Sequence, residues 1–129
     1  MEKPDRILVC ITPQSNGARL IDKGFETAAG GDVHILYIEK GADIFSLESA
    51  PALLQELFDY GAEKGGVIHA QCGDNITDEI RKFIKKEDIT HVILGEPPKN
   101  ANIASENVIG ELRATMPHIK LVIMEREDN

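Results

Sequence analysis

Three apolar, β-branched runs are followed by residues whose types suit contact with a small ligand. The segments are Cys10–Ser15, which contains Thr12, then Ile38–Lys40, and Gly95–Lys99. In a sheet of parallel strands, ligands bind at the carboxyl ends of the strands, near the point where the strand order reverses. We therefore take Thr12, Ile38, Gly95 and Lys99 as candidate binding residues.

Ser105 completes this set of candidates. It precedes an apolar helical period and is a good N-cap residue, so we expect the fourth helix to begin near it. A helix N-terminus attracts anions, and Lys99 adds a positive charge nearby in the sequence. Structural roles compete with binding at these positions, because a strand-end residue such as Thr12 or Gly95 also belongs to a turn.

The histidines and cysteines do not have the spacing of a metal site or a catalytic centre. The four histidines lie on or just before different apolar runs, without i, i+4 pairing, and are His34, His69, His91 and His118. We expect these histidines to have structural or surface roles and to bind no metal. All of them except His69 lie toward the amino ends of their predicted strands, away from the expected binding edge. Cys10 has no histidine near it in the expected layout, so a small buried hydrophobe is the better interpretation than a nucleophile.

Short strands and helical periods alternate along the whole chain. Five β-branched runs predict strands, at residues 7–11, 33–38, 67–70, 91–94 and 121–124. Four amphipathic periods between them predict helices, at about 15–29, 51–64, 75–87 and 105–116. This alternation predicts parallel pairing through right-handed crossovers, and hence one doubly wound α/β domain over residues 1–129 with helices on both faces.

Composition excludes several classes of function. Asp and Glu number 22 against 14 Lys and Arg, which gives a net charge of −8. A protein with this charge repels polyanions, so we expect neither nucleic acid nor an anionic membrane as a partner. No apolar run approaches the roughly 20 residues of a membrane span, and two cysteines are too few for a disulfide scaffold, so we expect a cytoplasmic protein.

Other doubly wound proteins require residues that this chain lacks. A receiver domain needs an acidic pair after the first strand, where Cys10-Ile11-Thr12 stands. A dinucleotide-binding dehydrogenase needs a Gly-x-Gly-x-x-Gly turn, and the sequence contains none. No nucleophile, base and orienting group come together, so we expect no enzymatic activity and no catalytic residue.

The order and spacing of the segments Arg6–Val9, Leu36–Ile38 and Thr90–Gly95 resemble those of the universal stress protein family over essentially the whole chain. The stretches Asn16–Ile21 and Thr90–Lys99 look most like the universal-stress-type domain of potassium-responsive sensor histidine kinases. The resemblance implies a five-stranded parallel sheet in the order 3-2-1-4-5 and a homodimer paired through the last strand. It also implies a cleft that holds an adenine nucleotide in some relatives.

Residues that hold ATP in those relatives are largely replaced here. The resemblance matches Ile38 to the apolar residue that packs on adenine, and Gly95 to the first glycine of the phosphate loop. Thr12 stands where ATP-binding relatives have Asp, Pro98 stands at the second glycine, and no Gly-Ser pair precedes the fourth helix.

Prolines have no N–H to offer a phosphate, and Glu96 adds negative charge. Losing two or three hydrogen bonds to a charged group, each about 1.5–3 kcal/mol, weakens binding by orders of magnitude. We therefore expect no tight ATP binding and no resident cofactor, and AMP is disfavoured with ATP.

Three hypotheses follow from the sequence. The favoured one is a non-enzymatic, homodimeric binding or regulatory module with a degenerate nucleotide loop. The second is a stress sensor that binds a nucleotide or another small anion through a rebuilt loop at residues 95–105. The third is an enzyme that acts on a nucleotide.

Overall fold

Parallel strands and helices alternate in a computed structural model of the chain, which describes residues 5–11, 17–40, 50–73, 75–95 and 103–124. The strands are β1 (Arg6–Ile11), β2 (Asp32–Lys40), β3 (Val67–Gly73), β4 (His91–Gly95) and β5 (Lys120–Met124). The helices are α1 (Gly17–Ala28), α2 (Ala50–Glu63), α3 (Ile76–Glu87) and α4 (Ile103–Thr115). Every predicted strand and helix is present.

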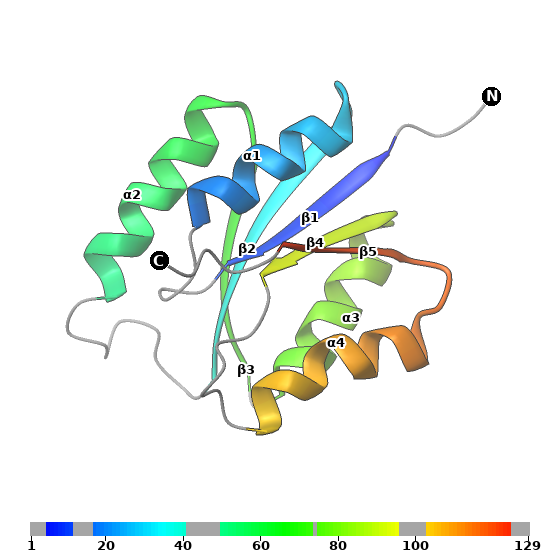
Figure 1. The fold of residues 1–129 in the computed structure, drawn as a ribbon. Helices are drawn as coiled ribbons and strands as arrows, with labels where there is room; N and C mark the ends of the chain where they lie inside the picture. Colours follow the sequence, from blue (N-terminus) through cyan, green and yellow to red (C-terminus); the bar gives the residue numbers. More distant parts are fainter. Residues whose placement is uncertain (1–4, 12–16, 41–49, 74, 96–102, 125–129) are drawn as a thin grey trace.

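The five strands form one parallel sheet in the order β3-β2-β1-β4-β5. Helices α1 and α2 cover one face of this sheet, and α3 and α4 cover the other (Figure 1). The predicted doubly wound α/β fold with strand order 3-2-1-4-5 is confirmed. The order reverses between β1 and β4, which places the ligand-binding edge of such a sheet at the carboxyl ends of these two strands.

Each face of the sheet has its own apolar core. On the α1/α2 face, Ile7, Val9 and Ile11 of β1 are buried with Ile21 and Leu57 from the helices. On the α3/α4 face, a second cluster is built from strand residues of opposite parity and from both helices, and it includes Leu8, Leu36, Ile80, Phe83, Val92 and Leu112. Burial on both faces explains why the strand sequences are nearly continuous in apolar residues.

Helix ends follow the capping signals of the sequence in three of four cases. Asn75 caps α3, its side chain accepting a hydrogen bond of 3.0 Å from the Asp78 N–H. Gly30 and Gly65, which follow α1 and α2, adopt positive φ angles of 96° and 97°. Helix α4 begins at Ile103, two residues before its predicted N-cap, so Ser105 lies in the first turn and is not the cap.

Candidate functional site

Two of the five candidate binding residues lie on described strand ends, and the structure places both at the predicted edge of the sheet. Gly95 is the last residue of β4, and Ile38 lies late in β2. Thr12 and Lys99 lie outside the described residues. Ser105 lies in α4, but its side chain is outside the described part of the chain.

Ile38 belongs to an apolar wall near the carboxyl ends of the strands on the α3/α4 face. It is half-buried and packs against the second core cluster, as do Cys10 of β1 and Val108 of α4. Leu94, immediately before Gly95, is a buried member of the same cluster. This face of the sheet therefore offers a hydrophobic surface against which a planar ring can pack.

Cys10 is a free thiol within this wall. Burial raises its pKa to about 12, so the thiolate that acts as a nucleophile is not populated at neutral pH. Strand β2 lies between β1 and β3, which keeps the backbone of Cys10 a whole strand away from that of Cys72. Cys10 is half-buried and packs against the second core cluster, which favours its interpretation as a small hydrophobe.

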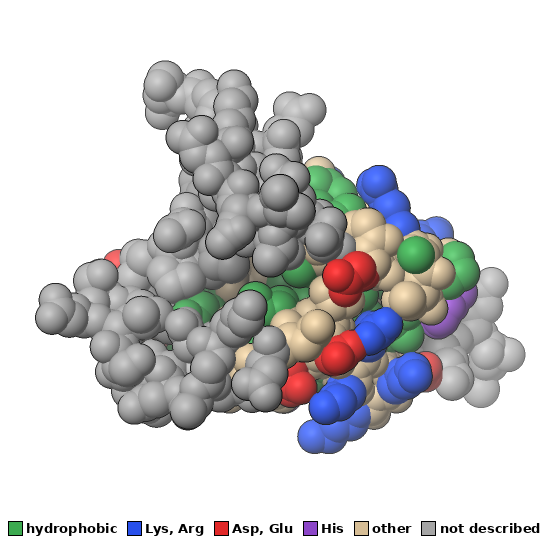
Figure 2. All heavy atoms as spheres, turned by 90° about the horizontal axis from the view of Figure 1, so that it is seen from below, with side chains coloured by type: hydrophobic (Ala, Val, Ile, Leu, Met, Phe, Trp, Pro, Cys, Tyr) green, Lys and Arg blue, Asp and Glu red, His purple; other side chains and the backbone are tan. Residues whose placement is uncertain are grey.

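Charges of both signs are interspersed on the part of the carboxyl-end surface that the structure describes (Figure 2). On α3, Arg81 pairs with Asp78, and Lys82 Nζ lies 3.3 Å from Glu79 Oε2. The basic side chains of α3 are therefore partly neutralised by acids one turn earlier. They form a solvated face rather than a site for a polyanion.

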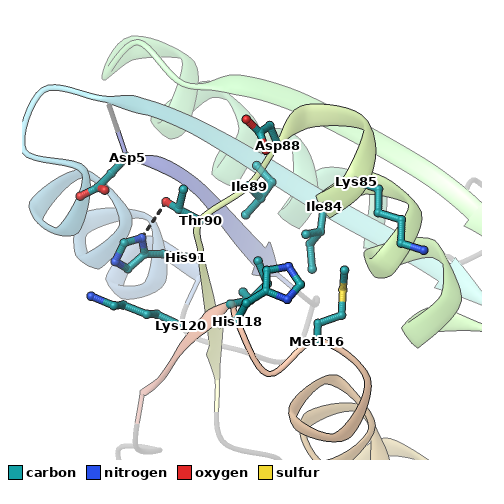
Figure 3. A pocket seen from close by; sticks show the side chains of 11 residues that line it. Asp5, Ile84, Lys85, Asp88, Ile89, Thr90, His91, Met116, His118 and Lys120 are labelled. Atoms are coloured by element: carbon teal, nitrogen blue, oxygen red, sulfur yellow. Dashed lines mark hydrogen bonds between the residues drawn. The ribbon is translucent and has the colours of Figure 1, made fainter. Parts of the chain in front are cut away.

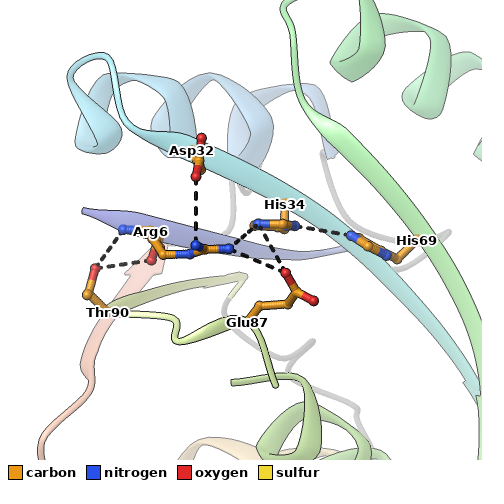
Figure 4. A network of polar contacts seen from close by, with 6 residues as sticks. All are labelled: Arg6, Asp32, His34, His69, Glu87 and Thr90. Carbon is orange, nitrogen blue, oxygen red and sulfur yellow. Dashed lines mark hydrogen bonds and ion pairs between the residues drawn. The ribbon is translucent and has the colours of Figure 1, made fainter. Parts of the chain in front are cut away.

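A polar network at the amino ends of the strands was not predicted from the sequence. His34 of β2 is only 6% exposed, and its Nδ1 lies 3.1 Å from Nε2 of His69 on β3. Arg6 of β1 reaches the other side of His34, with one guanidinium nitrogen 3.5 Å from Nε2 and 3.3 Å from Glu87 Oε1 (Figure 4). Phe83 of α3 packs edge-on against both imidazole rings.

The surroundings of both histidines in this network lower their pKa values and so favour the neutral imidazoles. Burial is the main cause that lowers the pKa of His34, and the nearby Arg6 cation lowers it further, against an opposing effect of Glu87. Burial also lowers the pKa of His69, followed by repulsion from His34. Their side chains meet because His69 stands opposite Leu36, two residues after His34, so the two imidazoles are diagonal neighbours on one face.

A shallow pocket of about 520 Å³ lies at the amino ends of β4 and β5, opposite the predicted binding edge (Figure 3). Thr90 orients His91, one of the side chains that line this pocket, because Nδ1 of His91 lies 2.8 Å from Thr90 Oγ1. The Thr90 hydroxyl itself donates to the Arg6 carbonyl. Lys85 and Lys120 face the pocket together with Asp5 and Asp88. These charges cancel, so the pocket has no electrostatic preference for an anion.

The described part of the chain has neither a metal-binding cluster nor a membrane-spanning helix. In those ranges, no three or more His, Cys, Asp or Glu side chains converge in a way that suits a metal ion. None of the helices there combines the length and the apolar character needed to cross a membrane.

These observations define a doubly wound α/β protein with an apolar wall near the carboxyl ends of its strands. No family model and no curated protein matches the sequence. Solved structures do match the fold. A universal stress protein in complex with cAMP aligns over 98% of this chain and 100% of its own, at 14% identity and a TM-score of 0.68.

Two further structures with the same fold support this comparison. The universal stress protein from Archaeoglobus fulgidus in complex with dAMP aligns over 95% of this chain and 98% of its own, at 15% identity and a TM-score of 0.64. A protein of this family from Burkholderia pseudomallei aligns over 94% and 96%, at 11% identity and a TM-score of 0.59. The chain therefore has the universal stress protein fold, as the resemblance implied.

Proposed function

We propose that this protein is a non-enzymatic binding or regulatory module of the universal stress protein type, with a degenerate nucleotide loop. The observation that carries the proposal is Gly95 at the end of β4, followed directly in the sequence by Glu96, Pro97 and Pro98. The fold supplies the edge at which nucleotides bind in its relatives, whereas Pro97 and Pro98 have no N–H to donate and Glu96 adds a negative charge that repels a triphosphate.

Calorimetric titration of the purified protein with Mg-ATP tests this proposal. We expect no heat of binding at micromolar protein and no release of phosphate over hours. Mass spectrometry of small molecules released on denaturation provides a second readout, because a tight ligand survives gentle purification. A stoichiometric ATP complex, or turnover that is lost in Thr12→Val, would overturn the proposal.

A second candidate function is binding of a nucleoside monophosphate. Two proteins with this fold hold cAMP and dAMP, each of which has a single phosphate and needs fewer donors than ATP. The half-buried Ile38 lies on the apolar wall near Gly95 and is available to pack on adenine.

Paired variants distinguish this second candidate from the first. If a monophosphate binds against the wall, AMP or cAMP raises the unfolding temperature of the native chain, and Ile38→Gln abolishes that rise. Val67→Gln is the matched control, because Val67 is 50% exposed on β3, away from the wall. If neither nucleotide raises the unfolding temperature, only the first candidate function remains.

We also propose that the protein is a homodimer paired through β5. This strand lies at one edge of the sheet, and its residues Leu121–Met124 are only half-buried. An apolar edge is a pairing hazard that a two-fold contact removes. The Lys120 N–H donates to the Thr90 carbonyl of the neighbouring segment, so by alternation the N–H of Ile123 points to the open edge.

This orientation gives a sharp test of the dimer. Ile123→Pro removes the outward N–H but no hydrogen bond to β4, whereas Ile123→Ala loses side-chain packing and keeps the N–H. We expect light scattering to give twice the 14.2 kDa protomer mass for the native chain and for the alanine variant, and the protomer mass for the proline variant. A monomeric native chain would contradict the proposal.

A further inference from the structure

The histidine pair at the amino ends of the strands has no part in the proposed function. It joins β2 to β3, which lies at the edge of the sheet and, among the described residues, pairs with β2. Charged groups reach the pair from each element packed against it, namely Arg6 of β1, Asp32 of β2, and Lys86 and Glu87 of α3.

The contacts fix where the protons lie. A guanidinium only donates hydrogen bonds, so Nε2 of His34 accepts from Arg6 at 3.5 Å. The ring proton of neutral His34 is therefore on Nδ1, and it is donated to Nε2 of His69 at 3.1 Å. This hydrogen bond exists only while Nε2 of His69 carries no proton.

Further protonation disrupts the arrangement at either ring. A proton on Nε2 of His69 brings two N–H groups face to face, and a proton on Nε2 of His34 points toward the Arg6 cation. Glu87 gives limited compensation, because its Oε1 lies 4.0 Å from His34 Nε2 and is already paired with Arg6 at 3.3 Å. The cluster therefore disfavours a second positive charge.

We propose that the His34–His69 pair is an acid-sensitive latch that holds the edge strand β3 to the sheet and opens when the imidazoles are protonated. Protonation is the trigger, because a proton on Nε2 of His69 removes the acceptor of the hydrogen bond that joins the two rings. The described residues provide no cluster of three metal ligands here.

Proton binding is linked to the opening of β3, and this linkage makes the pair weaker at acidic pH. Both pKa values are lowered in the folded state, so the unfolded or opened state binds protons first as the pH falls. The contribution of the pair is complete above the ordinary histidine pKa of about 6.5 and is lost as the pH falls below it. Each histidine raises the opening constant up to about tenfold per pH unit in that window.

Amide hydrogen exchange of the full chain tests the latch. Between pH 7.5 and 5.0, after correction for intrinsic exchange rates, we expect the protection of Ile68–Gln71 in β3 to fall at least tenfold more than that of Leu8–Cys10 in β1. Equal loss of protection in both strands, or none in either, would overturn the proposal.

A variant that keeps the hydrogen bond but not the titration provides the second test. In His69→Gln the side-chain oxygen still accepts from His34, so we expect the strand to form and the extra acid sensitivity of β3 to shrink. His118→Gln is the control, because His118 is exposed and lies outside the network. Acid sensitivity that is unchanged in His69→Gln, or lost equally in His118→Gln, would also overturn the latch. Neither result bears on nucleotide binding.

Discussion

Arg6 and Thr90 exchange hydrogen bonds across the junction of β1 and β4. The Arg6 N–H donates to Thr90 Oγ1 at 3.0 Å, and that hydroxyl donates to the Arg6 carbonyl at 3.1 Å. The Thr90 N–H also donates to the same carbonyl at 2.8 Å. These bonds fix the start of the two central strands and, with them, the position of the Arg6 side chain beside His34.

Removing the Thr90 hydroxyl is expected to destabilise the fold. Thr90→Val keeps the shape of the side chain but removes the acceptor of the Arg6 N–H, a partly buried hydrogen bond whose loss costs about 0.5–1.5 kcal/mol. Thr90→Ser keeps the hydroxyl, so its free energy of unfolding should fall by less than that of Thr90→Val. Urea denaturation monitored by circular dichroism measures both. Equal stability of the valine variant and the native chain would show that water replaces the hydroxyl.

Gly24 of α1 marks a close approach of helix and sheet. A Cβ at this position would lie 2.5 Å from Cγ2 of Val9, a stiff β-branched side chain that is fully buried. We expect Gly24→Ala to cost about 1–3 kcal/mol by overpacking, in spite of the better helix propensity of alanine.

Gly110 of α4 is the matched control for Gly24. It is exposed, and a Cβ there would meet nothing within 4 Å. Gly110→Ala should therefore stabilise the protein by up to about 1 kcal/mol. Thermal unfolding of the two variants should give shifts of opposite sign, and a stabilising Gly24→Ala would show that Val9 can move aside.

The cap of α3 is a third point to test. Asn75→Ala leaves the Asp78 N–H without its side-chain acceptor, at a cost of about 1 kcal/mol. Asn75→Asp retains an oxygen at the same place and adds a favourable charge at the helix N-terminus. Equilibrium unfolding of both variants should rank native and aspartate above alanine, and the reverse order would argue against the cap.

Alkylation kinetics test the environment of Cys10. In a Cys72→Ser background, we expect reaction with iodoacetamide at pH 8 to be slower by orders of magnitude in the native state than in urea. The reason is the thiolate fraction, about 10⁻⁴ for a pKa near 12 against about 10⁻¹ for an ordinary thiol. Comparable rates in the two states would show that the thiol is accessible and ionised.

Local sequence patterns were enough to predict the alternating strands and helices and the doubly wound class, whereas the strand order came from the resemblance to the universal stress protein family. Positions that are buried on a strand or helix carry apolar residues, such as Ile80 and Phe83 of α3, so the spacing of apolar residues in the sequence identifies these elements. Boundaries were less certain: β3 continues to Gly73, three residues beyond the predicted run, because pairing with β2 extends a strand past its apolar residues.

The histidine pair could not be predicted in the same way. His34 and His69 are 35 residues apart, and their contact depends on the register between β2 and β3. Register is set by the packing of whole strands and carries no signal at a single position. Of the candidate binding residues, Ile38 and Gly95 lie at the expected edge, while contact of any of the five with a ligand stays a prediction.

His34 and Ile38 share one strand and one face of the sheet, four residues or roughly 13 Å apart along β2. The strand between them pairs with β1 on one side and with β3 on the other. At this distance the two side chains do not touch, so a substitution at one position leaves the contacts of the other in place. Relatives of this scaffold that differ at the position of Ile38 should therefore keep the acid response that we propose for His34 and His69.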